Sequence, residues 1–316
     1  MLTNCAESFP SSLGRDMAPL RVALAGATGN LGISVLEALL QAHHSVTVLS
    51  RIGGNSSKLK PYTTITIKQI DFSNSETIRP ALEGIDVVVS CLATLAIGSQ
   101  DALIDASCAA GVRRFIPAEF GMDSLNPLCA GLPVCQPKVA TRQYLQEKHA
   151  NYPHFTWTGI ANGLFLDWGL NVGFIIDPAH HTATLYNGGD VLFSATTLAD
   201  VAKAVVGVIE KQDETKNRLV YIQSAAVTQN HLISYAREEG GQDWTLATRD
   251  LEDVLKDSHV ELERGEMQAA MDGYCKVAMW DTKYGGNFSS HLDNDLLGIE
   301  MLTEAELRAV FESSMR

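Results

Sequence analysis

Apolar runs alternate with amphipathic stretches along the first half of the chain. Residues 22–25 form a continuous apolar run, typical of a strand buried in a parallel sheet, and a glycine-rich turn follows it. Ile33, Leu36 and Leu40 then recur at helical spacing. A second run, rich in β-branched residues, covers residues 45–50. The segment therefore predicts a strand–helix–strand unit with a right-handed crossover.

The same alternation continues to about residue 160. We expect further strands at 63–71, 85–93 and 155–160, a short strand and turn at 113–121, and helices at 75–82, 100–110 and 137–150. Strands and helices that alternate in this way predict an α/β protein with a doubly wound parallel sheet of the Rossmann type.

The alternation weakens in the second half of the chain, which sets the expected domain organisation. Residues 1–19 are expected to form a disordered tail, residues 20–160 a dinucleotide-binding domain, and residues 161–316 mainly a smaller α/β substrate-binding region. Residues 197–222 contain an amphipathic helix and a strand, which we expect to return to the first domain. A Thr303–Glu306 capping box predicts a final helix.

The glycine-rich turn, G-A-T-G-N-L-G at residues 26–32, follows the first strand and opens the first helix. In such a turn Gly26 permits the tight bend, Gly29 lets a pyrophosphate approach the backbone, and Gly32 lets the helix pack on the sheet. The helix N-terminus presents free N–H groups and the positive end of its dipole to phosphate. We therefore predict that a dinucleotide binds here, through Gly26, Thr28, Gly29, Asn30, Leu31 and Gly32.

The end of the second strand predicts which dinucleotide binds. An acidic residue there would accept a hydrogen bond from the 2′-hydroxyl of NAD, but this chain has Arg51 and no acid between Ser45 and Ile70. A guanidinium favours the 2′-phosphate of NADP through charge-assisted hydrogen bonds. We predict NADPH/NADP⁺ as the cofactor, with Lys58 as a second, weaker cation. Where the central strand ends at the same edge of the sheet, we expect further cofactor contacts from Ser90, Cys91, Leu92 and Ala93.

Charge and composition narrow the classes of partner. The chain of 316 residues carries a formal net charge of −13 and has no Lys/Arg-rich run, which argues against direct binding to nucleic acid. It contains no apolar run long enough to span a membrane and no secretory signal. We expect a cytoplasmic protein, either a monomer or a homodimer, that acts on a small molecule.

The six cysteines do not indicate a metal site. None of them forms a C-x-x-C pair, and no His/Cys cluster has zinc-ligand spacing. Cys129 and Cys135 are six residues apart. They fit either a redox pair or two reduced thiols in a loop of a cytosolic protein.

Several motifs together resemble one protein family: GATGNLG, VTVLSR, IDVVVSCLA, GVRRFIPAEFG and a lysine before a helix. They are similar to the NmrA-like, isoflavone reductase-like branch of the atypical short-chain dehydrogenases, over about residues 21–165. This branch includes phenylcoumaran benzylic ether, pinoresinol-lariciresinol and leucoanthocyanidin reductases, and also NmrA-type regulators and NADPH sensors. The resemblance implies a Rossmann fold and NADP(H), and it implies that Asn162 and Phe165, joined by Trp168, line the substrate pocket.

The segment CQPKVATRQYLQEK, residues 135–148, contains two candidate lysines. Tyr144 and Lys148 have the Y-x-x-x-K spacing of short-chain dehydrogenases, but only seven residues separate Lys148 from the next strand. Lys148 should thus lie near the helix C-terminus, where the helix dipole alone favours a cation. The resemblance instead implies catalysis by Lys138, a short loop after the E-F-G motif. Lys138 is also expected to anchor the ribose of the cofactor, and Val134 stands where its tyrosine would be.

These expectations describe an NADPH-dependent reductase of a small aromatic or polyketide-like metabolite, in which Lys138 assists proton transfer. Two alternatives stay open. An isomerase or dehydratase would use the same site without net redox chemistry. A non-catalytic NADP(H)-sensing regulator would bind a protein partner in place of a substrate. The loop after the E-F-G motif contains no histidine, so a His-assisted reaction is not expected.

Overall fold

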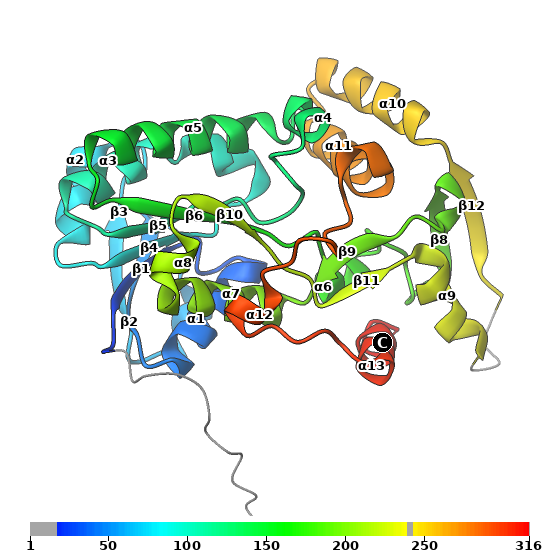
Figure 1. Cartoon of the computed structure of the whole chain (residues 1–316), viewed down its shortest axis with the longest axis horizontal. Coiled ribbons are helices and arrows are strands. Elements are labelled where there is room, and N and C mark those ends of the chain that lie inside the picture. The colour runs from blue at the N-terminus through cyan, green and yellow to red at the C-terminus, as the bar shows by residue number, and fades with distance from the viewer. Residues whose placement is uncertain (1–17, 239–242, 316) are drawn as a thin grey trace, which may run out of the picture.

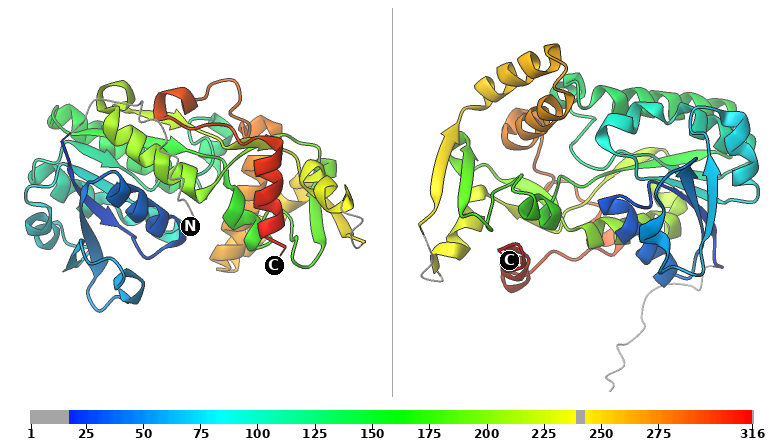
Figure 2. Two further views of the ribbon diagram at one scale, coloured as in Figure 1. Left: turned by 90° about the horizontal axis from the view of Figure 1, so that it is seen from below. Right: turned by 180° about the vertical axis from the view of Figure 1, so that it is seen from behind.

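The computed structural model describes residues 18–238 and 243–315. The expected tail, residues 1–19, lies outside the described residues except for its last two positions. The described chain forms a parallel sheet covered by helices on both faces, with a second, smaller region at one side (Figures 1 and 2).

The central sheet confirms the predicted doubly wound α/β fold. Seven strands, all parallel, lie in the order β3-β2-β1-β4-β5-β6-β10. The chain order reverses between β1 and β4, and sheets of this kind open a ligand crevice at that point, outside the carboxyl ends of the strands. The strands are β1 Arg21–Ala25, β2 Ser45–Arg51, β3 Thr66–Ile70, β4 Val87–Ser90, β5 Arg114–Ile116, β6 Thr156–Ala161 and β10 Arg218–Tyr221.

Alternate residues of β1 face opposite sides of the sheet, as the pleat requires. Val22 and Leu24 belong to the apolar core with α1 and α7, whereas Ala23 and Ala25 belong to the core with α3 and α5. Figure 1 shows the two helical layers. One layer contains α1 Asn30–Gln41, α7 Leu198–Glu210, α8 Gln212–Thr215 and α12 Asn294–Leu297, and the other contains α2 Ser75–Ile78, α3 Asp101–Ala109 and α5 Gln136–Asn151.

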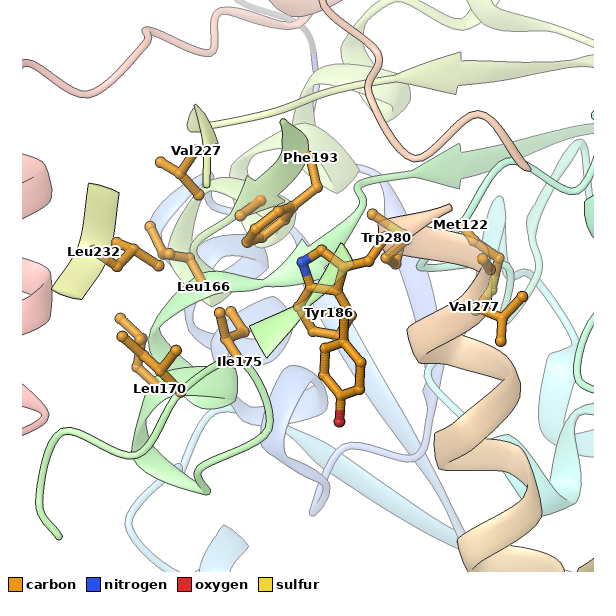
Figure 3. Packing of buried hydrophobic residues seen from close by; sticks show 14 of the residues in the cluster. Met122, Leu166, Leu170, Ile175, Tyr186, Phe193, Val227, Leu232, Val277 and Trp280 are labelled. Atoms are coloured by element: carbon orange, nitrogen blue, oxygen red, sulfur yellow. The ribbon is translucent and has the colours of Figure 1, made fainter. Parts of the chain in front are cut away.

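The smaller region has its own apolar core, centred on Trp280 (Figure 3). The Trp280 ring stacks on Tyr186 with 4.9 Å between centroids, and the Phe193 ring meets it edge-on at 5.4 Å. Two small sheets, β11-β9-β7 and β12-β8, pack with helices around this core. Their elements are β7 Leu164–Phe165, β8 Thr182–Tyr186, β9 Phe193–Thr196, β11 Ala225–Val227, β12 Thr245–Arg249, α4 Pro127–Gly131, α6 Leu166–Asn171, α9 Gln229–Glu238, α10 Leu251–Glu263, α11 Met267–Trp280 and α13 Glu304–Ser313.

Local signals predicted some of these elements and missed others. The Thr303–Glu306 capping box is present at the start of α13. The helix predicted at 75–82 has one α-helical turn and continues as a 3-10 helix at Pro80, which lacks the N–H group an α-helix needs. The segment between the turn predicted at 113–121 and the helix predicted at 137–150 contains the short helix α4, which was not predicted. Strand β12 was not predicted, because all five of its residues are exposed and no buried alternation marks it.

Candidate active site

The glycine-rich turn connects the carboxyl end of β1 to α1. Gly26 has φ +81°, and a Cβ atom on it would lie 2.3 Å from the carbonyl oxygen of Cys91. A Cβ on Gly32 would lie 2.1 Å from the Gly26 carbonyl oxygen, whereas one on Gly29 would lie 3.3 Å from that atom. Because backbone atoms lie so close, positions 26 and 32 accept only glycine. Gly29 forms the N-cap of α1 with φ −75°, and its role in ligand approach to the helix N-terminus stays a prediction.

Arg51 lines a cleft of about 610 Å³ between the carboxyl ends of β2 and β3 and the start of α3. Ile52 next to it exposes 70% of its surface, which gives an apolar wall for a planar base. Across the cleft, Asp71 accepts hydrogen bonds from the backbone N–H and the hydroxyl of Ser73. These bonds lower the pKa of the Asp71 carboxyl. The residues that line this cleft are Arg51, Ile52, Ile70, Asp71, Phe72, Ser73, Ser99, Asp101 and Ala102.

Sequence reasoning found only Arg51 in this cleft. Asp71 and Phe72 follow β3 directly, and this position is the signal that would have found them. The carboxyl ends of parallel strands share one edge, so residues just after β2 and β3 belong together. The guanidinium and the apolar wall of this cleft fit an adenosine with a 2′-phosphate.

A second cleft, of about 270 Å³, separates the glycine-rich turn from α6 and α7. Lys58 lines it and donates a hydrogen bond from Nζ to the carbonyl oxygen of Thr28, at 3.3 Å. Lys58 and Arg51 thus line different clefts, and their predicted joint contact with one phosphate stays a prediction. Trp168, expected in the substrate pocket, faces this cleft together with Gly29, Asn30, Ile33, Lys58, Asp167, Asn171 and Leu198.

Lys138 lies in the first turn of α5 and is buried, with 3% of its surface exposed. Its ammonium donates hydrogen bonds to the carbonyl oxygens of Glu119 and Phe120, the second at 3.1 Å. The thioether sulfur of Met122 lies 3.6 Å from Nζ. Gly121 has φ +142°, and a Cβ on it would lie only 3.0 Å from Nζ. The turn after β5 therefore fixes the ammonium at the carboxyl edge of the sheet.

Glu119 belongs to this turn, and its buried carboxyl group was not predicted as part of the site. Ser124 donates a hydrogen bond to it, and Arg142 donates to the Ser124 hydroxyl at 2.6 Å. Burial raises the pKa of Glu119, against the opposing effects of Lys138 and of the bond from Ser124. Gly159 of β6 makes room, because a Cβ there would lie 3.1 Å from the Glu119 Cγ atom. Lys138 and Arg142, one helical turn apart, hold the two ends of the 119–124 turn.

Tyr144 and Lys148 have a structural partner. The ammonium of Lys148 lies 2.6 Å from a carboxylate oxygen of Asp105 in α3, and the hydroxyl of Tyr144 donates to the same oxygen at 2.7 Å. The Lys148 ammonium also lies 4.6 Å from the centroid of the Tyr144 ring. Lys148 is in the last turn of α5, at the opposite end from Lys138. The pair therefore joins α5 to α3, and its spacing is explained without catalysis.

Two polar side chains at the carboxyl edge have unpaired oxygens. Ser90 ends β4 and Asn162 follows β6, and both are fully buried. Neither Ser90 Oγ nor Asn162 Oδ1 has a hydrogen-bond partner within the described residues. Phe165 is half-buried and meets Trp168 edge-on, with 6.4 Å between ring centroids. Unpaired buried oxygens at this edge fit a ligand with hydrogen-bond donors, while the predicted contacts of these residues stay predictions.

Cys129 and Cys135 lie close together in the fold. The sulfur atoms of Cys129 and Cys135 lie 3.2 Å apart, and both cysteines are buried and free. Residues 18–238 and 243–315 contain no group of three or more His, Cys, Asp or Glu side chains that could hold a metal ion. No helix in that part of the chain is long and apolar enough to cross a membrane.

Comparison with known proteins agrees with these motifs. The model of the NmrA-like family matches residues 20–277. The oxidoreductase aprR of Aspergillus flavus is 34% identical over 78% of this chain and 83% of its own length. The oxidoreductase poxI of Penicillium oxalicum is 31% identical over 81% of this chain and 82% of its own length. Among solved structures, the binary complex of leucoanthocyanidin reductase and NADPH from Vitis vinifera is similar with a TM-score of 0.79 and 23% identity, over 93% of this chain and 99% of that one. The chain therefore belongs to the NmrA-like family.

Proposed function

We propose that this protein is an NADPH-dependent reductase of a small aromatic or polyketide-like metabolite, in which Lys138 assists proton transfer. The observation that carries the proposal is the buried ammonium of Lys138, fixed at the same sheet edge as the glycine-rich turn. The oxidoreductase relatives and the NADPH-bound structural neighbour support it. Segments from residues 161–316 supply most of the substrate pocket in this proposal.

The residues present fit NADPH along the edge of the sheet. The turn at 26–32 and the N-terminus of α1 would hold the pyrophosphate, and the Arg51 cleft would hold the adenosine with its 2′-phosphate. Ser90 to Ala93 and Lys138 would contact the nicotinamide riboside. When bound, NADPH supplies the hydride, and the chain supplies orientation and proton transfer.

Lys138 has one N–H bond that is more available than the others. Two of its three N–H bonds point to the carbonyl oxygens of Glu119 and Phe120, which are strong acceptors. The remaining contact, to the thioether of Met122 at 3.6 Å, is weak. A substrate oxygen displaces the thioether more easily than either carbonyl. We therefore propose that the proton of this N–H bond passes to the oxygen atom of the reduced substrate.

Arg51→Ala is expected to raise the Kd for NADPH by about thirtyfold, since charge-assisted bonds to a phosphate contribute about 2 kcal/mol. The Kd for NADH should change by less than about threefold, because NADH carries no 2′-phosphate. Titration calorimetry with both cofactors measures this, with Lys60→Ala, an exposed cation in the same loop, as the matched control. Equal losses for NADPH and NADH would place Arg51 outside the phosphate site.

A substrate screen tests the reaction class. Aromatic ketones, enones and polyketide-like compounds are incubated with NADPH, and both NADPH oxidation and product mass are measured. A reductase gives a product with two added hydrogens for each NADPH oxidised. An isomerase gives a product of unchanged mass, and a dehydratase one that has lost water, both without net NADPH oxidation. A sensor turns over nothing and captures a protein partner with an affinity that differs between NADPH and NADP⁺.

A further inference from the structure

The side-chain oxygen of Asn162 is the one polar group of this residue without a partner. Asn162 is fully buried. Its backbone N–H donates to the Gly121 carbonyl at 3.0 Å, its side-chain NH2 donates to the Gly163 carbonyl at 3.2 Å, and its carbonyl accepts from the Thr196 hydroxyl at 2.6 Å. Oδ1 accepts nothing from the described residues. A buried acceptor without a donor is costly, so a native site gives it one.

Asn162 is held rigidly beside the catalytic candidate. Gly121 accepts hydrogen bonds from the N–H groups of both Asn162 and Gly163, at 3.0 and 2.9 Å, and it lies in the turn that fixes the Lys138 ammonium. Gly163 has φ +65°, and a Cβ on it would lie 2.0 Å from the carbonyl oxygen of Ser194. The bend after β6 therefore cannot relax, and Asn162 stays close to the reacting end of the site.

We infer that Asn162 is a positioning residue whose Oδ1 atom accepts a hydrogen bond from the carboxamide N–H of the nicotinamide ring. Oδ1 is purely an acceptor and needs a donor, and the carboxamide NH2 is the donor at the hydride-transferring end of NADP(H). Two N–H bonds of Lys138 go to the carbonyl oxygens of Glu119 and Phe120, and the third is assigned to the substrate oxygen, so Lys138 is not the donor that Oδ1 needs. The assignment rests on the cofactor in the proposed function, and it replaces the substrate contact that the sequence resemblance implied for Asn162.

The bond would form away from water, because Oδ1 is closed to solvent. One hydrogen bond of this kind fixes the rotation of the carboxamide. It thereby fixes which face of the ring points toward Lys138 and the substrate.

The test compares NADP⁺ with its 3-acetylpyridine analogue, in which a methyl ketone replaces the amide and removes the N–H donor. Dissociation constants are measured by calorimetry for the wild type and for Asn162→Leu, which has the same branching and no acceptor. The wild type should bind the analogue about fivefold more weakly than NADP⁺. Asn162→Leu should bind NADP⁺ about fivefold more weakly than the wild type does, and it should lose no further affinity with the analogue. Asn151→Leu, at the exposed far end of α5, is the control and should behave as the wild type.

Each other outcome overturns the inference. If Asn162→Leu binds NADP⁺ as the wild type does, Oδ1 does not accept a hydrogen bond from the cofactor. If the variant still loses affinity with the analogue, another group binds the carboxamide. Should the variant fail to fold in a thermal melt, the wild type alone decides, since equal affinity for the two dinucleotides contradicts the bond. No substrate or turnover is involved, so a failed substrate screen leaves this result standing.

Discussion

Lys138→Met is expected to lower kcat for NADPH-dependent reduction by about a thousandfold, the usual range for loss of a positioned proton donor. Methionine keeps an unbranched side chain, one atom shorter, but has no N–H bond to give. The Kd for NADPH should rise by no more than about tenfold, because in the proposed arrangement the glycine-rich turn and the Arg51 cleft hold most of the cofactor. Steady-state kinetics and a binding titration separate the two effects.

Two further variants show which property of Lys138 matters. Lys138→Arg keeps the positive charge, but a guanidinium does not release a proton in the accessible pH range, so kcat should stay low. Activity in this variant would instead indicate that charge alone is needed. Lys148→Met removes the lysine with the familiar tyrosine spacing. It should leave kcat within about twofold and lower the melting temperature, because the ion pair with Asp105 joins α5 to α3. A large loss of kcat in Lys148→Met would move the chemistry to the other lysine.

The residues at the carboxyl edge of the sheet could be predicted from the sequence, because the hydrophobic period and the order of elements along the chain determine which residues lie there. Apolar runs and helical spacing gave the parallel strands, and parallel strands bring their carboxyl ends together. Gly26, Ser90 and Lys138 were therefore expected at one edge, and the structure has all three there. Arg51 was found by the same reasoning, since it ends β2.

The contacts between segments far apart in the chain could not be predicted in this way. Ser124 donates to Glu119 and Arg142 donates to Ser124, through side-chain directions that a one-dimensional pattern does not carry. Asn162 was expected in the substrate pocket by resemblance, but its full burial could not be read from the sequence, and its ligand contact stays a prediction. Trp168 lines the cleft opposite the glycine-rich turn, a placement that the sequence did not give, and its expected substrate contact also stays a prediction. Burial and orientation at these positions depend on packing between the two regions of the fold.

Gly32→Ala is expected to lower the free energy of unfolding by about 3 kcal/mol and to abolish measurable NADPH binding. Its new Cβ would lie 2.1 Å from the carbonyl oxygen of Gly26, 2.8 Å from the Gly26 carbonyl carbon and 2.9 Å from the Cα of Ala27. All three are backbone atoms, so no side chain can move aside, and α1 must shift away from the turn. Chemical denaturation and an NADPH titration measure the two losses.

Gly29→Ala is the matched control, because it adds the same methyl group to the same motif. Its Cβ would meet only the Gly26 carbonyl oxygen, at 3.3 Å, and φ at Gly29 is −75°, which alanine adopts readily. The free energy of unfolding should change by less than about 1 kcal/mol. NADPH binding should still weaken by about tenfold, because in the proposed arrangement the methyl group stands where the pyrophosphate approaches the helix N-terminus. If Gly29→Ala binds NADPH as the wild type does, the motif glycine at 29 has no part in cofactor binding. If Gly32→Ala melts as the wild type does, α1 can move away from the turn without loss of stability, and the inference from these distances is wrong.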